Sequence, residues 1–173
     1  MRKIDIPFGR PIVDVEEIEA VKKVLVSPIL AHGPVCAEFE KTFAELIGAK
    51  FAISVASGTA ALHLSLYASN IGPGDEVIVP AMSHVATAHA VEYCGAKPIF
   101  ADVDPKSGNI SPESISTCLS KRTKAIIVVH FLRLPCEMDA INKIAQSVGA
   151  LVFEDAALAL GAKYGNKMSG NLA

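Results

Sequence analysis

Apolar residues recur every three or four positions near the start of the chain, which predicts an amphipathic helix. Asp14 stands at its start and Glu17 follows three residues later, the spacing of a capping box. Ser27 and Pro28 then end the helix, because the residue before a proline disfavours helical conformation. The apolar positions of this helix are Val15, Ile18, Val21 and Leu25.

A second helical pattern covers residues 35–47, after a loop with the sequence AHGP. Its apolar side carries Phe39, Phe43 and Leu46. Gly48 ends it, since glycine readily adopts the left-handed conformation that follows many helices. We therefore expect residues 1–49 to form an N-terminal helical arm.

From residue 50 onward, short apolar runs alternate with helical stretches. The runs are continuous and rich in Val and Ile, which is typical of strands buried on both faces of a sheet. The pattern predicts an α/β fold over residues 50–173, with a mostly parallel sheet and helices on both faces. The expected strands cover 51–55, 76–79, 98–103, 125–129 and 150–153. The expected helices cover 59–68, 83–93, 112–119 and 138–148.

The composition narrows the classes of protein that remain. Of the 173 residues, 51% are hydrophobic and 20% are charged, and the formal net charge is −2. This balance excludes a disordered tail and provides no electrostatic footprint for nucleic acid or an anionic membrane. No apolar run reaches the roughly 20 residues that span a bilayer, and the N-terminus lacks the apolar centre of a signal peptide.

Hydropathy and cysteine usage add two expectations. The mean hydropathy of +0.39 is high for a small protein, so a partner or further chain is expected to cover part of the apolar surface. The four cysteines form no CxxC pair, which argues against a zinc site and for reduced thiols in a cytoplasmic protein. They are Cys36, Cys94, Cys118 and Cys136.

Candidate chemistry lies just after the expected strands, where ligands bind in parallel α/β sheets. Ser57, Gly58 and Thr59 follow the first strand and lead directly into a helix. The free amides at a helix start attract anions, and Gly58 allows a close approach, so this run is a candidate phosphate cradle. The simpler interpretation is an ordinary helix cap.

Two further strand ends carry polar side chains. Glu154 and Asp155 follow the last strand, and a partly desolvated Asp there favours a positive partner such as a protonated pyridine nitrogen. The alternative is a solvated acid pair that caps the next segment. His84 follows the second strand and is a candidate to stack on a flat ligand, or else a cap or surface residue. His130 is expected to hold a strand end by hydrogen bonding.

Taken in order, these segments resemble the front half of the DegT/DnrJ/StrS-type sugar aminotransferases, pyridoxal-phosphate enzymes of the aspartate-aminotransferase fold (fold type I). The resemblance runs from IPFGRP at 6–11 to the last residues. The resembling segments are SGTAAL at 57–62, GPGDEVIVPAMSHVATAHAV at 72–91, GAKPIFADVD at 95–104, TKAIIVVHF at 123–131, MDAI at 138–141 and EDAA at 154–157.

The resemblance implies a role for each candidate. Gly58 and Thr59, with Ser57 beside them, would bind the phosphate of pyridoxal 5'-phosphate. His84 would stack on the pyridine ring, and Asp155 would pair with its nitrogen. The family also implies transfer of an amino group from a donor such as glutamate to a nucleotide-linked keto-sugar. It further implies a homodimer, for which the helical arm is the expected contact.

Three departures from the family pattern affect the expectation. The Schiff-base lysine belongs to a later SF…K motif, and Lys163 and Lys167 follow Asp155 too closely to match it. Leu158 stands where many members have Gln or His, and Arg133 stands where the pattern has glycine. The chain is thus expected to be an incomplete large domain without a catalytic lysine, inactive alone. A decayed remnant and a module that binds another phosphate ligand remain as alternatives.

Overall fold

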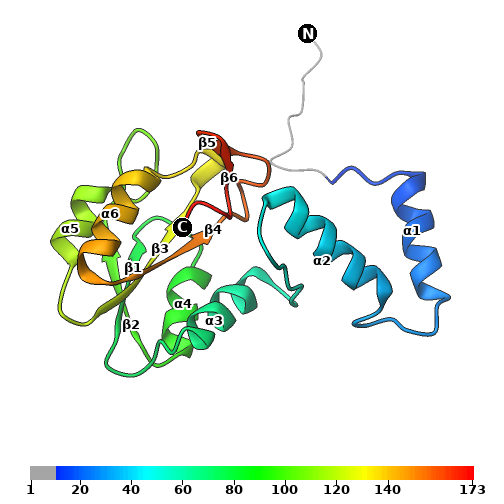
Figure 1. Cartoon of the computed structure of the whole chain (residues 1–173), viewed down its shortest axis with the longest axis horizontal. Coiled ribbons are helices and arrows are strands. Elements are labelled where there is room, and N and C mark those ends of the chain that lie inside the picture. Colours follow the sequence, from blue (N-terminus) through cyan, green and yellow to red (C-terminus); the bar gives the residue numbers. More distant parts are fainter. Residues whose placement is uncertain (1–10) are drawn as a thin grey trace, which may run out of the picture.

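The computed structural model describes residues 11–173. Residues 6–10 of the resembling IPFGRP run, and the N-terminal stretch expected to lack a signal peptide, lie outside the described residues. Two helices stand to one side of a sheet that carries the other helices (Figure 1). They are α1 (Val15–Leu25) and α2 (Pro34–Ile47).

The ends of both helices follow the sequence. The Asp14 side chain accepts from the Glu16 amide, and the Asp14 amide donates to Glu17 Oε2 at 2.9 Å, so the predicted capping box is confirmed. Gly48 ends α2 with φ +79°, a left-handed conformation that glycine adopts without strain. The Asn171 side-chain amide donates to the Gly48 carbonyl at 3.1 Å and connects this end of α2 to the segment after β6.

The sheet has four strands, all parallel, in the order β2-β1-β3-β4. This confirms the predicted mostly parallel α/β architecture. The strands are β1 (Glu76–Pro80), β2 (Lys97–Ala101), β3 (Thr123–Val129) and β4 (Leu151–Asp155). The helices that pack on it are α3 (Gly58–Ala68), α4 (Ala86–Tyr93), α5 (Pro112–Cys118) and α6 (Met138–Val148). Among the described residues, no helix is long and apolar enough to cross a membrane.

Alternation along β1 and β3 divides the core into two layers. One layer joins Ile78 and Ile126 to the buried residues of α5 and α6. The other joins Val77 and Ile127 to α3 and α4. Both central strands are therefore covered on both faces, which explains why their sequences are continuous apolar runs.

The expected strand at residues 51–55 is wrong for the described structure. This segment forms no ladder with any described strand, and Phe51 and Ile53 are 74% and 81% exposed. A strand is stabilised by pairing and by covering its faces, and a favourable composition supplies neither. The segment is attached to α2, where the Ser54 amide and hydroxyl both donate to Glu40 Oε1 at 2.7 Å.

Smaller differences concern boundaries. The helix expected from residue 83 begins at Ala86, because His84 Nδ1 accepts from the Ala86 amide in a turn before the helix. The strand expected at 98–103 ends at Ala101. The antiparallel hairpin of β5 (Lys163–Tyr164) and β6 (Lys167–Met168) was not predicted, since two-residue strands have no readable periodicity. The division at residue 49 stays a prediction.

Candidate functional site

The amino end of α3 lies toward the carboxyl edge of the sheet. The last turn of α3 connects through residues 69–75 to the start of β1, and the 11 residues of α3 span about 16 Å, close to the length of a five-residue strand. The helix therefore runs back along the sheet with its first residues at the edge where the strands end.

The first turn of α3 is capped and open. Ser57 Oγ accepts from the Ala60 amide at 3.1 Å, so the predicted cap exists. The amides of Gly58 and Thr59 have no acceptor among the described residues. A Cβ added to Gly58 would meet nothing within 4 Å, so the space before these amides is free. The cap and a phosphate cradle are thus compatible, because they use different amides.

Asp155 is the last residue of β4, whereas the expected strand ended at residue 153 and left both acids after it. Its carbonyl accepts from the His130 amide at 3.1 Å, which extends the pairing of β3 with β4. Its Oδ1 accepts from the Ala157 amide at 3.1 Å, and its other carboxylate oxygen has no partner among the described residues. The carboxylate is therefore oriented by one hydrogen bond and available for another.

His84 lies in the turn that joins β1 to α4, at the same edge. Its Nδ1 accepts from the Ala86 amide at 3.1 Å, and the residue is exposed. This bond holds the ring in place and leaves its faces open. Ser57, Gly58, Thr59, His84 and Asp155 thus share one edge, although no hydrogen bond among the described residues joins the three segments.

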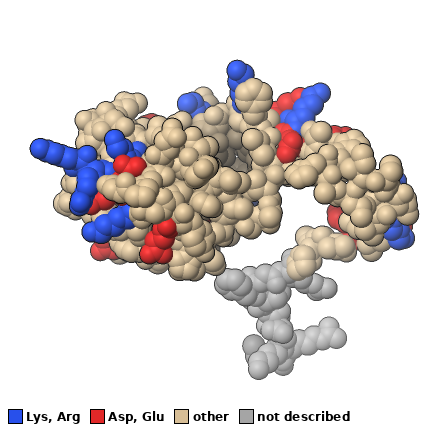
Figure 2. All heavy atoms as spheres, turned by 90° about the horizontal axis from the view of Figure 1, so that it is seen from below, with Lys and Arg blue, Asp and Glu red and all other residues tan. Residues whose placement is uncertain are grey.

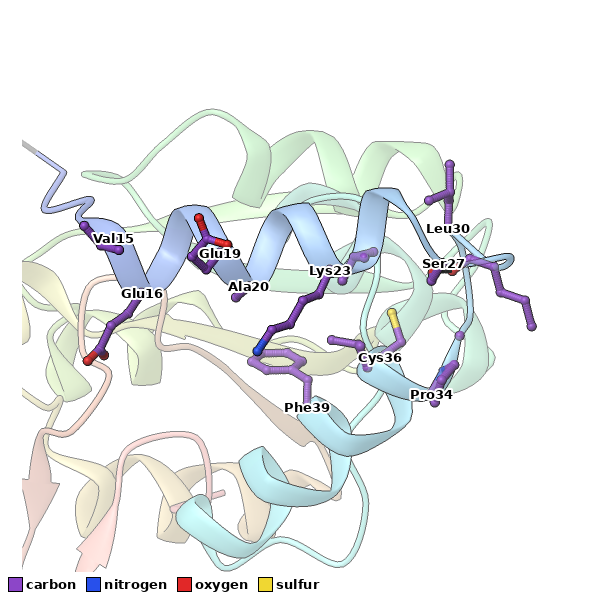
Figure 3. A pocket seen from close by; sticks show the side chains of 14 residues that line it. Val15, Glu16, Glu19, Ala20, Lys23, Ser27, Leu30, Pro34, Cys36 and Phe39 are labelled. Atoms are coloured by element: carbon purple, nitrogen blue, oxygen red, sulfur yellow. Dashed lines mark hydrogen bonds between the residues drawn. The ribbon is translucent and has the colours of Figure 1, made fainter.

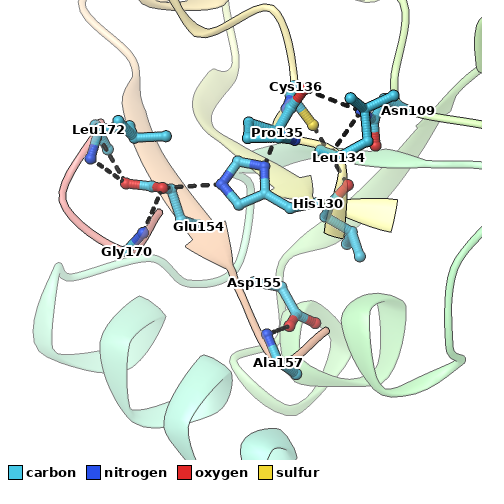
Figure 4. A network of polar contacts seen from close by, with 12 residues as sticks. Asn109, His130, Leu134, Pro135, Cys136, Glu154, Asp155, Ala157, Gly170 and Leu172 are labelled. Carbon is cyan, nitrogen blue, oxygen red and sulfur yellow. Dashed lines mark hydrogen bonds and ion pairs between the residues drawn. The ribbon is translucent and has the colours of Figure 1, made fainter. Parts of the chain in front are cut away.

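Glu154 does not fit the alternative of a solvated acid pair. Its side chain is only 5% exposed and accepts from His130 Nε2 at 2.9 Å (Figure 4). Burial raises the pKa of this carboxyl, but the hydrogen bonds from His130 and from backbone amides outweigh burial and lower the pKa. The prediction that His130 holds a strand end is confirmed.

Asn109 was missed in the sequence. It is 5% exposed, its Oδ1 accepts from the Phe131 amide, and its Nδ2 donates to the Leu134 and Pro135 carbonyls at 2.9 and 3.2 Å. These bonds fix the turn η1 (Phe131–Arg133) after β3 (Figure 4). Nothing in the sequence sets this asparagine apart from a solvated loop residue, because its partners are 22 to 26 positions away.

The departures from the family pattern have clear structural positions. Arg133 has φ +73°, the left-handed conformation for which the pattern has glycine, and Leu132 before it has φ +46°. Leu158 is 54% exposed, and its side chain offers no hydrogen bond. Lys163 and Lys167 lie on the short hairpin of β5 and β6.

A groove away from this edge is lined mainly by apolar side chains. It measures about 850 Å³ and is formed by α1, α2 and the loop between them, and none of the candidate residues lines it (Figure 3). Apolar side chains such as Val15, Leu30 and Phe39 line it, and they are 57% to 71% exposed. In the view of Figure 2, charged side chains gather mainly at the end of the sheet away from this groove.

Comparison with known proteins gives consistent matches. The model of the DegT/DnrJ/EryC1/StrS aminotransferase family matches residues 11–173. The chain is 44% identical over 167 residues to the spore coat polysaccharide biosynthesis protein SpsC of Bacillus subtilis, covering 96% of this chain and 43% of that protein.

Solved structures agree with the sequence matches. An aminotransferase from Psychrobacter cryohalolentis matches with a TM-score of 0.89 and 42% identity, over 94% of this chain and 42% of that one. A GDP-4-keto-6-deoxymannose-3-dehydratase, solved with PLP and glutamate trapped together, matches with a TM-score of 0.90 and 32% identity, over 96% of this chain and 45% of that one. The chain thus spans less than half the length of these relatives.

Proposed function

Because the chain belongs to the DegT/DnrJ/EryC1/StrS aminotransferase family, we propose that it supplies the cofactor-holding part of a sugar aminotransferase. The family and its solved members indicate pyridoxal phosphate as the cofactor. The observation that carries the proposal is the carboxyl edge of the sheet. Two helix amides without acceptors, an oriented carboxylate and a hydrogen-bonded imidazole lie at this edge. Each of these groups suits a different part of pyridoxal phosphate.

Each candidate residue would bind a different group of the cofactor. The amides of Gly58 and Thr59, with Ser57 beside them, bind the phosphate, because a helix start carries partial positive charge. The free oxygen of Asp155 would accept a hydrogen bond from the protonated pyridine nitrogen, and His84 would stack on the ring. When bound, the cofactor supplies an electron sink for the substrate carbanion, and the Asp155 carboxylate holds the ring nitrogen protonated for that purpose.

The substrates and the assembly follow from the relatives. We propose glutamate as an amino donor and a nucleotide-linked keto-sugar as the acceptor, since relatives are named for polysaccharide biosynthesis and for a GDP-sugar reaction. We also propose a homodimer in which the apolar side of the arm, α1 and α2, contacts the second subunit. The four free cysteines suit a reducing compartment, and we propose the cytoplasm.

We propose that neither Lys163 nor Lys167 serves as the Schiff-base lysine of the family. Lys163 and Lys167 lie on a surface hairpin only eight and twelve residues after Asp155. We therefore propose that this polypeptide, assayed alone, binds the cofactor but does not transaminate. Formation of an amino sugar from a nucleotide-linked keto-sugar and glutamate by the purified chain would contradict this.

Binding of the cofactor tests the site directly. We expect the purified chain to bind pyridoxal phosphate more tightly than pyridoxal in equilibrium dialysis, because only the former carries the phosphate. Asp155→Asn should weaken binding by about tenfold, the scale of one lost hydrogen bond to a charged group.

The matched control is Glu92→Gln, which changes an exposed glutamate in the last turn of α4, away from the carboxyl edge, and should leave binding unchanged. Equal affinity for pyridoxal phosphate and pyridoxal would refute the phosphate cradle. Equal affinity of Asp155→Asn and the unsubstituted chain would refute the role of Asp155.

A further inference from the structure

The buried carboxylate of Glu154 collects four hydrogen-bond donors. Oε1 accepts from the amides of Leu172 and Ala173 at 2.6 and 2.9 Å, and Oε2 accepts from the Gly170 amide at 2.8 Å and from His130 Nε2 at 2.9 Å (Figure 4). A carboxylate has about four favourable acceptor positions, so this one is saturated. Glu154 is therefore fixed on every side.

The hydrogen bonds also fix the tautomer of His130. The Cys136 amide can only donate, and it lies 3.1 Å from Nδ1, so Nδ1 carries the lone pair and Nε2 carries the proton. The ring is fully buried and bonded at both nitrogens. His130 thus links the turn after β3 to Glu154 in a single orientation.

Adjacent residues of a strand point to opposite faces. Glu154 and Asp155 are adjacent, and they leave β4 in different directions (Figure 4). Holding the Glu154 side chain on one face therefore sets the rotation of the strand end about its own axis, and this rotation decides where the carboxylate on the other face points. The main-chain bond from the His130 amide to the Asp155 carbonyl fixes the position of the strand end but not this rotation.

We propose that His130 is a positioning residue: through Nε2 and Glu154 it sets the rotation of the end of β4, and so aims Asp155 at the pyridine nitrogen. This inference rests on the proposed role of Asp155. Of the two hydrogen bonds made by the His130 ring, the one to Glu154 is assigned the positioning role, and the one with the Cys136 amide is not.

Two substitutions separate these bonds. In His130→Gln the side-chain amide reaches as far as Nε2 and can donate to Glu154, but it leaves the Cys136 amide without its acceptor. In His130→Asn the side-chain oxygen lies near the position of Nδ1 and can accept from Cys136, but it leaves Glu154 short of one donor. Each variant loses one buried hydrogen bond, so we expect similar losses of thermal stability.

The readout is the nitrogen NMR shift of 15N-labelled pyridoxal phosphate bound to each variant, which reports protonation of the ring nitrogen. We expect a protonated nitrogen with the unsubstituted chain and with His130→Gln. We expect a shift toward the unprotonated form with His130→Asn and with Asp155→Asn. Affinity should fall by about tenfold in His130→Asn and remain within about twofold in His130→Gln.

Glu76→Gln is the matched control, because Glu76 is a second buried carboxylate but lies at the amino edge of the sheet. It should lower stability and leave the nitrogen signal unchanged. Equal signals in the two His130 variants, with Asp155→Asn still altered, would overturn this inference alone. An unaltered signal in Asp155→Asn, or no binding by the unsubstituted chain, would overturn the proposed function and this inference together. If His130→Asn does not fold, loss of the signal in His130→Gln overturns the inference and its retention supports it.

Discussion

The arm and the sheet both carry apolar patterns, but they bury them very differently. On β1, Val77, Ile78 and Val79 are fully buried. On α1, Val15 and Leu25 are 71% and 65% exposed, and the helix has no buried residue. The difference shows that an apolar pattern identifies the face that needs to be covered, whereas a partner in space decides whether it is covered. An isolated helix of 11 residues is only marginally stable in water.

The largest difference between the sheet and the arm is expected in the stability lost when a large apolar side chain is removed. Ile126→Ala removes a fully buried side chain between the sheet and the α5–α6 layer, and we expect a loss of about 2–5 kcal/mol in the free energy of unfolding. Ile18→Ala on α1 changes a half-exposed side chain and should cost less than about 0.5 kcal/mol. Urea unfolding measures both. Equal losses would mean that another molecule covers the arm in solution.

Acidification should unfold the sheet. The Ser120 hydroxyl and the Arg122 guanidinium donate to the buried Glu76 and hold its pKa below the usual value of 4.5, although burial opposes the shift. The pKa of Glu154 is lowered as well. A lowered pKa in the folded state contributes stability that is full above the unfolded pKa and is lost as pH falls through the folded pKa.

We therefore expect thermal stability to drop below about pH 4.5, the ordinary glutamate value. Glu76→Gln removes one of the titrating groups, so its melting temperature should fall less steeply with acid over the same range. A slope identical to that of the unsubstituted chain would exclude Glu76 as a contributor.

A gain is expected at the turn after β3. A non-glycine residue in the left-handed region destabilises the folded state by roughly 1–2 kcal/mol, and glycine removes this strain. Part of the gain is lost because glycine makes the unfolded chain more flexible. Arg133→Gly should therefore raise the stability of the sheet region by about 0.5–1 kcal/mol in urea unfolding. The control is Lys121→Gly at an exposed turn without positive φ, which should lower stability. A loss in Arg133→Gly would show that its side chain contributes more than the strain costs.

The smallest global effect is expected at the helix caps of the arm. Asp14→Ala should speed amide exchange within α1 and leave the midpoint of global unfolding unchanged, because α1 is not packed. Ser111→Ala removes the equivalent cap of α5, which is packed on the sheet, and should lower global stability by about 1 kcal/mol. A global loss in both variants would place the arm in the same cooperative unit as the sheet.

The sequence predicts best those helices and strands whose apolar pattern shows which faces must be covered by neighbouring elements. The buried runs of β1 and β3 and the amphipathic helices were placed to within a few residues, because both faces of these strands had to be covered. Residues 51–55 have the same composition as a strand, yet pairing depends on a neighbour that no local pattern describes. The burial of Glu154 was missed for a similar reason, since its donors come from residues 130 and 170–173.

For the candidate site, residue types and order identified the segments at the carboxyl edge. The supporting contacts were harder to predict. Asn109 and Glu154 act through partners distant in sequence, and the placement of the predicted free amides of Gly58 and Thr59 at this edge depends on the direction of α3. The resemblance to a family added assignments for Ser57, His84 and Asp155, and these remain predictions that the binding experiments test.

The open segment at residues 51–55 has a practical consequence for handling the protein. Its backbone lacks a ladder among the described residues, and it exposes Phe51, Ile53 and Val55 at alternate positions. Such a segment is a template for strand addition between molecules, a common start of aggregation. We expect the purified chain to self-associate as concentration rises. A lysine in place of Ile53 should reduce that tendency, since like charges oppose stacking of identical segments.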